Sequence, residues 1–298
     1  MPLRRKYSVA VPANLSYMKL AKIFVFFTII ASILTISGFE KENAQVVKFY
    51  SPEKGVYITD INTKSCPDCI SVYLSNSLET VEDVATKTNS VIAINAGFFD
   101  PTNTQTTSYV VINGQIAADP SLNAHLMNNP ALKEYLPTIL NRSEFRIMDC
   151  EGEQKFDIAL HNQRPTDGRC VINHSVQGGP ELVPNFNLSK EGFVVKKRSK
   201  IIRQSVGALG KYARSAIGIK KDHILLITVG NEAAMTLEEF SKFMKKQNVE
   251  KAMAFDGGSS TSLYVNLPDY PKFVLTSAKN NSARRVKSMI LGSYPKEI

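Results

Sequence analysis

Residues 251–261 constrain the fold more than any other part of the sequence, because an apolar run meets a sharp break there. The run ends in Asp256-Gly257-Gly258, which predicts a buried strand followed by a tight turn. Asp256 is therefore expected at the carboxyl end of this strand, facing a crevice. The two glycines permit positive φ angles and leave room for a ligand to approach the backbone.

Three hydroxylated residues follow the glycines: Ser259, Ser260 and Thr261. Their hydroxyls and N–H groups are expected to form an anion-binding nest beside the carboxylate. The alternative is an ordinary hairpin, in which an Asp-Gly turn joins the strand to a second one at residues 262–265. Taken alone, the residue types in this stretch favour the hairpin.

A second buried strand also leads into a polar residue. Residues 91–94 are apolar, and Asn95 and a glycine bend follow them. An Asn before such a bend often bonds only to its own turn, but the parallel with Asp256 favours a shared site. Arg214 stands in the small, apolar stretch 213–220, where a solvent-facing role and an anion-binding role are equally supported.

The other patterns predict an α+β fold, with a mixed, largely antiparallel sheet core and a few packed helices. A helix is expected from a cap at Ser77 to residue 88. Asn113-Gly114 predicts a tight hairpin. Thr236 and Glu239 form a capping box at the start of a helix that leads into the Asp256 strand.

The composition, 43% apolar and 21% charged, is that of a globular protein. We expect one domain over residues 42–298, with a polar, irregular surface excursion at about 119–170. Four cysteines suit an oxidising compartment. Cys150 and Cys170 bracket a polar segment and are expected to form a disulfide. Cys66 and Cys69 are expected as a local disulfide or two free thiols, because no further ligands complete a zinc site.

The N-terminal segment carries much of the positive charge. Of the formal charge of +9, residues 1–39 contribute five basic and no acidic residues, which leaves 31 basic against 27 acidic residues, or +4. That is too weak for a nucleic-acid footprint. The apolar run 23–36 predicts a signal peptide or signal anchor over residues 1–38, with Met18 as an alternative start. The rest is then exported to the periplasm, cell envelope or exterior, tethered to the membrane if the segment is uncleaved.

The ordered motifs resemble the phosphodiester glycosidase family, in its exported, exopolysaccharide-related bacterial form. The resemblance covers about residues 91–291 and includes Asn-Ala-Gly-Phe-Phe-Asp, Gly-Gly-Pro-Glu-Leu-Val, Ala-Arg-Ser-Ala-Ile-Gly, Phe-Asp-Gly-Gly-Ser-Ser-Thr and a closing arginine. It implies hydrolysis of a sugar-1-phosphodiester. We expect no cofactor and no metal site, and the sequence leaves open calcium held by Asp side chains. The matching site positions are Asn95, Gly97, Phe98, Gly178, Gly179, Arg214, Asp256, Gly257, Gly258, Ser259, Ser260 and either Arg284 or Arg285.

The residue chemistry agrees with that implication. Asp256 is expected to be the catalytic carboxylate, because glycosyl transfer needs one near an oxocarbenium-like centre. Arg214 and one C-terminal arginine would hold the phosphate. Asn95 would bond sugar hydroxyls or orient Asp256. A second carboxylate would have to come from Asp100, Glu181 or Glu232, and none is compelling.

Three other classes of protein compete with this interpretation. A serine hydrolase lacks its elbow, because Thr261 replaces the second glycine of Gly-x-Ser-x-Gly. A metallohydrolase lacks clustered ligands. The serious alternative is a non-catalytic envelope protein that binds polysaccharide or anionic glycans in the same pocket. The sequence assigns neither the sugar nor the oligomeric state.

Overall fold

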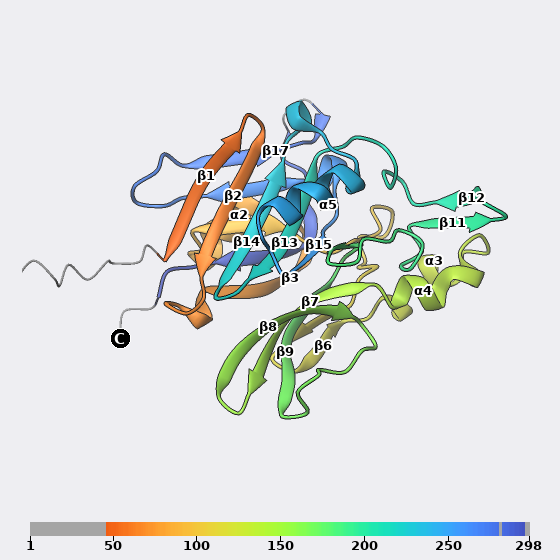
Figure 1. Ribbon diagram of the computed structural model, residues 1–298, viewed down its shortest axis with the longest axis horizontal. Helices are drawn as coiled ribbons and strands as arrows, with labels where there is room; N and C mark the ends of the chain where they lie inside the picture. The colour runs from red at the N-terminus through yellow and green to blue at the C-terminus, as the bar shows by residue number, and fades with distance from the viewer. Residues whose placement is uncertain (1–45, 280–281, 296–298) are drawn as a thin grey trace, which may run out of the picture. The chain divides into compact units, whose positions relative to one another are not determined.

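The computed structural model describes residues 46–279 and 282–295 (Figure 1). The expected signal segment at residues 1–38 lies outside them. All hydrogen-bonded strand pairs in the described residues are antiparallel. The predicted α+β class, with a largely antiparallel sheet core and few helices, is therefore confirmed. No helix in these described ranges is long and apolar enough to cross a membrane.

Two sheets carry most of the sequence motifs. The first has the order β1(Val47–Glu53), β2(Val56–Asn62), β14(His223–Val229), β13(Arg214–Lys220), β15(Lys251–Ala254), β10(Glu181–Val183). The second has the order β17(Phe273–Thr276), β16(Ser262–Val265), β4(Ile92–Asn95), β18(Val286–Gly292), β3(Ile70–Glu79). Strand β13 is buried almost throughout. Because both faces of β13 are covered by protein, its sequence is apolar or small at successive positions and does not alternate with polar residues.

The third sheet has the order β6(Gln115–Ala118), β5(Val110–Ile112), β9(Cys170–Gln177), β7(Ser143–Cys150), β8(Glu153–Leu160). A separate hairpin pairs β11(Val194–Lys197) with β12(Lys200–Gln204). The Asn113-Gly114 hairpin is confirmed, with φ angles of 52° and 71° at its two turn residues. The disulfide between Cys150 and Cys170 joins opposed positions of β7 and β9. Cys66 and Cys69 form the local disulfide.

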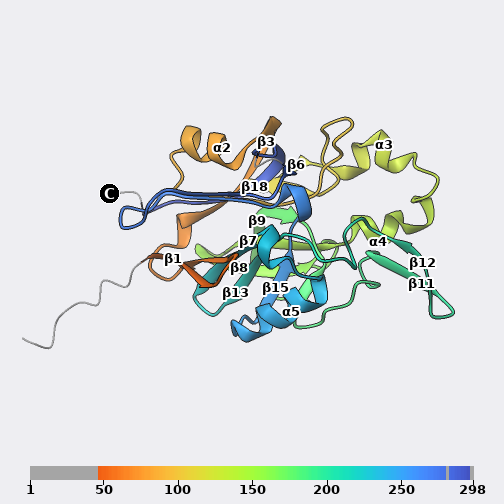
Figure 2. The ribbon, with the colours of Figure 1, turned by 90° about the horizontal axis from the view of Figure 1, so that it is seen from above.

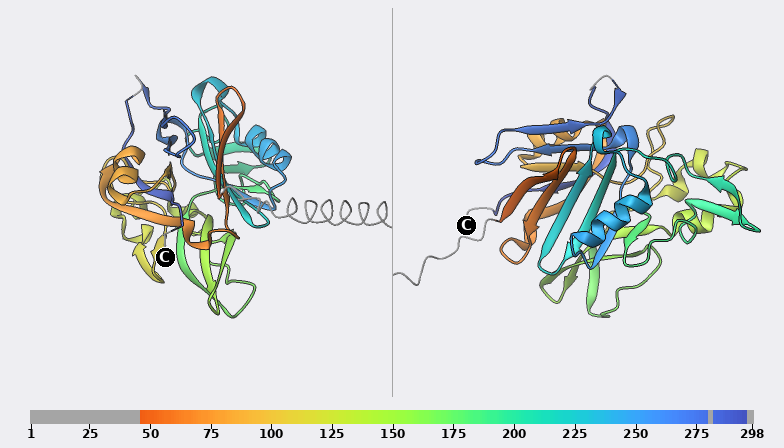
Figure 3. Two further views of the ribbon diagram at one scale, coloured as in Figure 1. Left: turned by 90° about the vertical axis from the view of Figure 1, so that its left-hand side faces the viewer. Right: turned by 45° about the horizontal axis from the view of Figure 1, so that its top comes forward.

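The helices are α2(Val81–Thr88), α3(Ala124–Met127), α4(Leu136–Leu140) and α5(Leu237–Lys246), with short 3-10 turns η1(Pro67–Cys69), η2(Pro120–Leu122), η3(Lys133–Tyr135), η4(Asn231–Ala233) and η5(Gly258–Ser260). Helix α5 lies across the first sheet, as Figure 3 shows, and buries Phe240 and Met244 there. The capping box of Thr236 and Glu239 at its start is confirmed.

The main core lies among the three sheets. It includes Ile61 of β2, Ile94 of β4, Ile147 of β7, Ile217 of β13 and Leu263 of β16. Helix α2 covers the other face of the second sheet, which Figure 2 shows edge-on. This arrangement brings the ends of β4, β13 and β15 together at the boundary between sheets.

Two sequence expectations about local structure were wrong. The cap of α2 is Thr80, whose hydroxyl accepts from Asp83 N at 3.1 Å, because β3 continues past Ser77 to Glu79. Residues 119–170 are not an irregular surface excursion throughout. They contain β7, which is almost wholly buried, and β8. The polar residues of β7 misled the prediction because they pair with one another inside the protein.

Candidate active site

Asp256 lies where the chain passes from one sheet to another. Strand β15 belongs to the first sheet and β16 to the second. The hairpin alternative is therefore excluded. The backbone of the connection is fixed on both sides, because Phe255 N donates to Ser215 O at 2.8 Å and Asp256 N donates to Ala96 O at 2.9 Å.

Burial sets the protonation of this carboxyl. Asp256 is half-buried. Burial raises its pKa to about 6, and the Ser260 hydroxyl, the Arg284 charge and the Gly257 N–H oppose that rise. The group therefore changes charge close to neutral pH, where an acid or base catalyst is most effective.

The amide of Asn95 holds the Asp256 connection rather than facing the cavity. Its Nδ2 donates to Asp256 O at 2.6 Å. Its Oδ1 accepts from Ser215 Oγ at 2.7 Å and from Ser262 N at 3.0 Å. Asn95 thus connects both sheets to Asp256. These bonds fit the expected role of orienting Asp256, and they leave the Asn95 amide facing away from the cavity, where a sugar hydroxyl would bind.

Arg214, the first residue of β13, is buried and tied to backbone carbonyls. Its Nε donates to Met235 O at 2.9 Å, and its Nη2 donates to Gly207 O at 3.0 Å and to Gly210 O at 2.7 Å. Nη1 takes part in none of these bonds. Burial lowers the pKa of Arg214 to about 10, so the group stays charged at neutral pH. The fixed guanidinium leaves one nitrogen for an anion.

The structure distinguishes the two adjacent C-terminal arginines. Arg284 lines the cavity, and its Nη1 donates to Ser259 Oγ at 2.9 Å. Its guanidinium also lies 5.6 Å from the ring centre of Phe99, and its Nε is buried without a partner. Arg285 is exposed and does not line the cavity.

The cavity has a volume of about 570 Å³. The sequence-predicted residues that line it are Phe98, Gly179, Arg214, Asp256, Gly257, Gly258, Ser259, Ser260 and Arg284. Asp256 is the one carboxylate among the described residues that line it. The candidate second carboxylates Asp100, Glu181 and Glu232 do not line it. In the described ranges, no group of three His, Cys, Asp or Glu side chains is placed to hold a metal ion.

The expected glycines act in two ways. A Cβ at Gly97 would lie 2.8 Å from Gln177 O, and one at Gly178 would lie 2.8 Å from Ala254 O, so both permit close packing beneath the cavity. Gly179 does line the cavity, with a φ of +103° that suits glycine. A Cβ there would lie 2.5 Å from Glu191 Oε2.

Three backbone donors around the expected nest are taken up by internal bonds. Gly258 N donates to Ala213 O at 2.8 Å, Ser260 N to Gly257 O at 3.2 Å, and Thr261 N to Gly258 O at 3.1 Å. These donors therefore do not face a ligand. Three arginine side chains, those of Arg142, Arg214 and Arg284, also line the cavity.

One of those side chains, Arg142, was missed in the sequence. Arg142 lies in the chain between α4 and β7, and its side chain lines the cavity. Its guanidinium lies 3.9 Å from the ring centre of Phe193. Its Nε donates to Glu191 O at 3.1 Å. Burial lowers its pKa to about 10. The alternation of polar and apolar residues over 144–147 was the available signal, because it predicts a strand that would begin close to Arg142.

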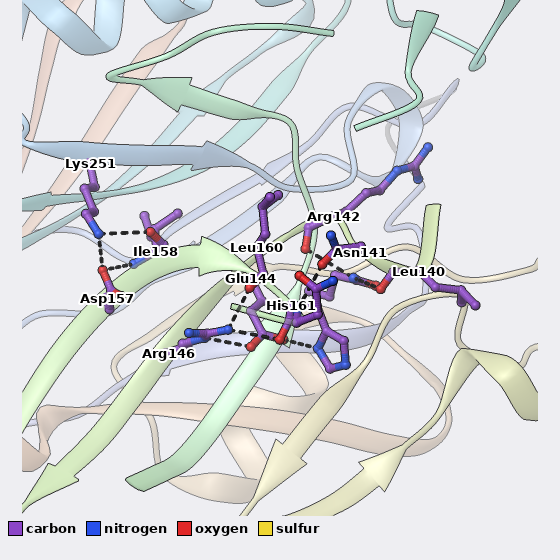
Figure 4. A network of polar contacts seen from close by, with 12 residues as sticks. Leu140, Asn141, Arg142, Glu144, Arg146, Asp157, Ile158, Leu160, His161 and Lys251 are labelled. Atoms are coloured by element: carbon purple, nitrogen blue, oxygen red, sulfur yellow. Dashed lines mark hydrogen bonds and ion pairs between the residues drawn. The ribbon is translucent and has the colours of Figure 1, made fainter. Parts of the chain in front are cut away.

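A buried polar network fixes the backbone on which Arg142 stands (Figure 4). Arg146 Nε donates to Glu144 Oε1 at 2.7 Å, and Glu144 Oε2 lies 2.7 Å from His161 Nδ1. His161 N in turn donates to Arg142 O at 3.1 Å. Glu191 adds a second anchor, because its carboxylate accepts from Ser143 N at 2.7 Å. Burial raises the pKa of Glu191.

Comparison with known proteins finds relatives of the fold. Three solved structures share the fold. A hypothetical protein from Synechocystis is 18% identical (TM-score 0.52), with 82% of this chain and 61% of that protein covered. The zebrafish N-acetylglucosamine-1-phosphodiester alpha-N-acetylglucosaminidase catalytic domain, auto-inhibited by its pro-peptide, is 18% identical (TM-score 0.58), with 86% of each chain covered.

The third is a Burkholderia pseudomallei protein described as exported, at 14% identity (TM-score 0.55), with 80% of this chain and 74% of that protein covered. This chain thus spans about three fifths of the Synechocystis protein. A search of curated proteins finds no match. The family model for phosphodiester glycosidase matches residues 88–291, which hold Asn95, Arg214, Asp256 and Arg284. By that match, over more than half its length, the chain belongs to the phosphodiester glycosidase family.

Proposed function

We propose that this protein hydrolyses sugar-1-phosphodiesters at the bond between C1 of the sugar and the phosphate oxygen, releasing the sugar and a phosphomonoester. The observation that carries the proposal is the pairing of one carboxyl, whose pKa is about 6, with three arginines in one cavity. Family membership and the name of the zebrafish relative, which specifies an N-acetylglucosamine-1-phosphodiester, support the same reaction.

Asp256 acts on the sugar in this scheme. Above pH 6 the carboxyl is mainly ionised, and at pH 7 the carboxylate exceeds the acid by about ten to one. Its negative charge stabilises the positive charge that develops at C1 as the bond to oxygen breaks. Asn95 keeps the Asp256 backbone in place while this charge develops.

The arginines act on the phosphate. A phosphomonoester is a good leaving group, so charge neutralisation helps its departure more than protonation does. Arg214 and Arg284 supply fixed positive charge beside Asp256, and Arg142 supplies a third. The charge of Arg284 lowers the pKa of Asp256, and burial outweighs it.

We also place the enzyme outside the cytoplasm, in the periplasm, envelope or extracellular space. The two disulfides support this location, because such bonds persist in oxidising compartments. An envelope or extracellular glycan that contains sugar phosphates is the substrate class expected there. Cleavage of residues 1–38 as a signal peptide stays a prediction.

The position of bond cleavage tests the reaction. The protein is incubated with a sugar-1-phosphodiester in water labelled with the heavy isotope of oxygen, and the masses of the products are measured by mass spectrometry. Cleavage at C1 places the heavy oxygen in the sugar and none in the phosphate. Heavy oxygen in the phosphate would mean attack at phosphorus and would overturn the proposal.

A substitution separates catalysis from binding. Asp256→Asn should abolish sugar release and keep glycan binding, whereas Asp68→Asn, a change on an exposed acid, should leave both unchanged. Binding by the wild type, without turnover of any sugar-phosphodiester in a panel, would favour the non-catalytic envelope protein instead.

A further inference from the structure

The hairpin of β11 and β12 projects from one wall of the cavity. Phe193, which precedes β11, and residues 205–208, which follow β12, line the cavity. Between them the hairpin forms a two-stranded sheet of its own. Figures 1 and 2 both place it at one side of the molecule, away from the first sheet.

The tip of this hairpin is strongly cationic. We call its exposed basic residues the cationic tip: Lys196, Lys197, Arg198 and Lys200. Residues 192–221 contain no Asp or Glu. In the described part of the chain, no member of the cationic tip forms an ion pair.

The charges of the tip also oppose one another. Lys197 and Lys200 lie directly opposite across the two strands, next to Arg198 in the turn. Like charges at opposed positions destabilise a strand pair, and an isolated two-stranded hairpin has little stability to lose. An anionic surface would remove that repulsion.

Apolar side chains accompany the charges. Ile201 and Ile202 are 48% and 54% exposed. Ile202 lies in a bulge, because the pairing passes from Val195 opposite Arg203 to Lys196 opposite Ile201. Both isoleucines therefore present aliphatic groups to solvent at one irregular point of the hairpin. Val206, on the cavity rim beside the hairpin, is fully exposed. A soluble polyanion would bind the cations but would not bury the aliphatic side chains. The interface of an anionic bilayer binds cations and buries aliphatic side chains at the same time.

We propose that the β11–β12 hairpin docks onto a bilayer with anionic headgroups. The cationic tip lies among the headgroups and the two isoleucines enter the interface. Since Phe193 and residues 205–208 connect the hairpin to the cavity, docking brings the cavity close to the membrane surface. The inference rests on the hairpin alone and does not depend on the proposed hydrolysis.

The chain contains no Trp, so one introduced Trp reports on one position. The test uses full-length Ile202→Trp, with vesicles of equal parts phosphatidylglycerol and phosphatidylcholine. Its emission should shift to the blue and be quenched by brominated lipids. Tyr50→Trp is the matched control, because Tyr50 is 42% exposed on β1, across the molecule from the hairpin in Figure 1. It should show neither change.

Charge removal tests the cause. Lys197→Gln, Arg198→Gln and Lys200→Gln together, in the Ile202→Trp background, should weaken vesicle partition about a hundredfold, at about fivefold for each cation. Residues 1–45 are identical in all variants, so the difference reports on the hairpin.

Four results would overturn the proposal. They are no blue shift with anionic vesicles, an equal shift with pure phosphatidylcholine, undiminished partition after charge removal, and a protein-concentration-dependent shift without vesicles, which would indicate self-association. Binding of soluble polyphosphate to the tip, without quenching by brominated lipids, would assign the hairpin to an anionic polymer instead.

Discussion

The cavity combines two groups of residues that are held in different ways. The strand-end group consists of Arg214, residues 256–260 and Arg284, beside the ends of β13, β15 and β18. The loop group consists of Arg142, Phe193 and residues 205–208. Backbone bonds tie the Asp256 connection to both neighbouring sheets. The loop group packs as a smaller cluster of Phe193, Val194 and Ala208.

This difference suggests a division of labour. Catalysis requires groups that keep their positions as charge develops, and the strand-end group meets that requirement. Substrate binding tolerates more adjustment, so the loop group suits recognition of the phosphate and of whatever is attached to it. Substitutions in the first group should lower kcat, and those in the second should raise KM.

Apart from the loss of turnover expected for Asp256→Asn, the largest effect on kcat is expected from Arg214→Met. Loss of a fixed cation that stabilises the departing phosphate should lower kcat by about a hundredfold to a thousandfold. Steady-state kinetics measure this, with Arg203→Gln as the control, because Arg203 donates to Gly192 O and lies outside the cavity. A variant that unfolds at a lower temperature but keeps its kcat would show that Arg214 serves the fold alone.

Asp256→Asn should stabilise the protein at neutral pH. The pKa of Asp256 is about 6 in the folded state against 3.8 unperturbed, so the folded state binds the proton more tightly. Stability from this group is therefore complete below about pH 4 and is lost as the pH rises through 6. The variant should gain at most about 3 kcal/mol at pH 7, and denaturant unfolding should show no gain at pH 4. An equal difference at both pH values would mean that the carboxyl has an ordinary pKa.

Asn95→Ala should lower kcat by about tenfold to fiftyfold, with little change in KM, because Asp256 O loses its donor. Stability should fall by about 1–3 kcal/mol, since buried partners are left unpaired. A purely structural role would leave the pH profile unchanged. The positioning role predicts a shift in the kinetic pKa of the remaining activity.

Arg142→Met should give the smallest effect, a rise in KM of about tenfold with kcat within a few fold. Arg142→Lys should restore part of the affinity, because a charge returns without the stacking on Phe193. A larger loss of kcat in Arg142→Met than in Arg214→Met would mean that the loop group, and not the strand-end group, carries catalysis.

The same division explains what the sequence could predict. A local pattern, an apolar strand that ends in a polar residue, drew attention to Asp256 and Asn95. Taken alone it favoured an ordinary turn, and the ordered motifs of the family decided for a site. Arg142 was missed because its place in the cavity depends on contacts with Phe193 and Glu191, which are remote in the sequence. Sequence order also left open which C-terminal arginine lines the cavity, since adjacent residues differ only in the direction they face.

Much of the fold followed from local rules in the same way. The capping box at Thr236 and the Asn113-Gly114 turn each depend on a few neighbouring residues. Strand β7 was mistaken for an irregular segment because Glu144 and Arg146 are polar. Their side chains bond to each other, and Arg146 Nη2 donates to Leu160 O inside the protein. No local pattern reveals these contacts.

The dependence of kcat/KM on pH, measured for the wild type on a sugar-1-phosphodiester, tests the central claim most directly. If the ionised Asp256 carboxylate is the catalytic group, kcat/KM rises with a slope of one to a plateau above about pH 6, and Asp256→Asn shows no turnover at any pH. Turnover by Asp256→Asn within tenfold of the wild type, with the same inflection, would contradict the account.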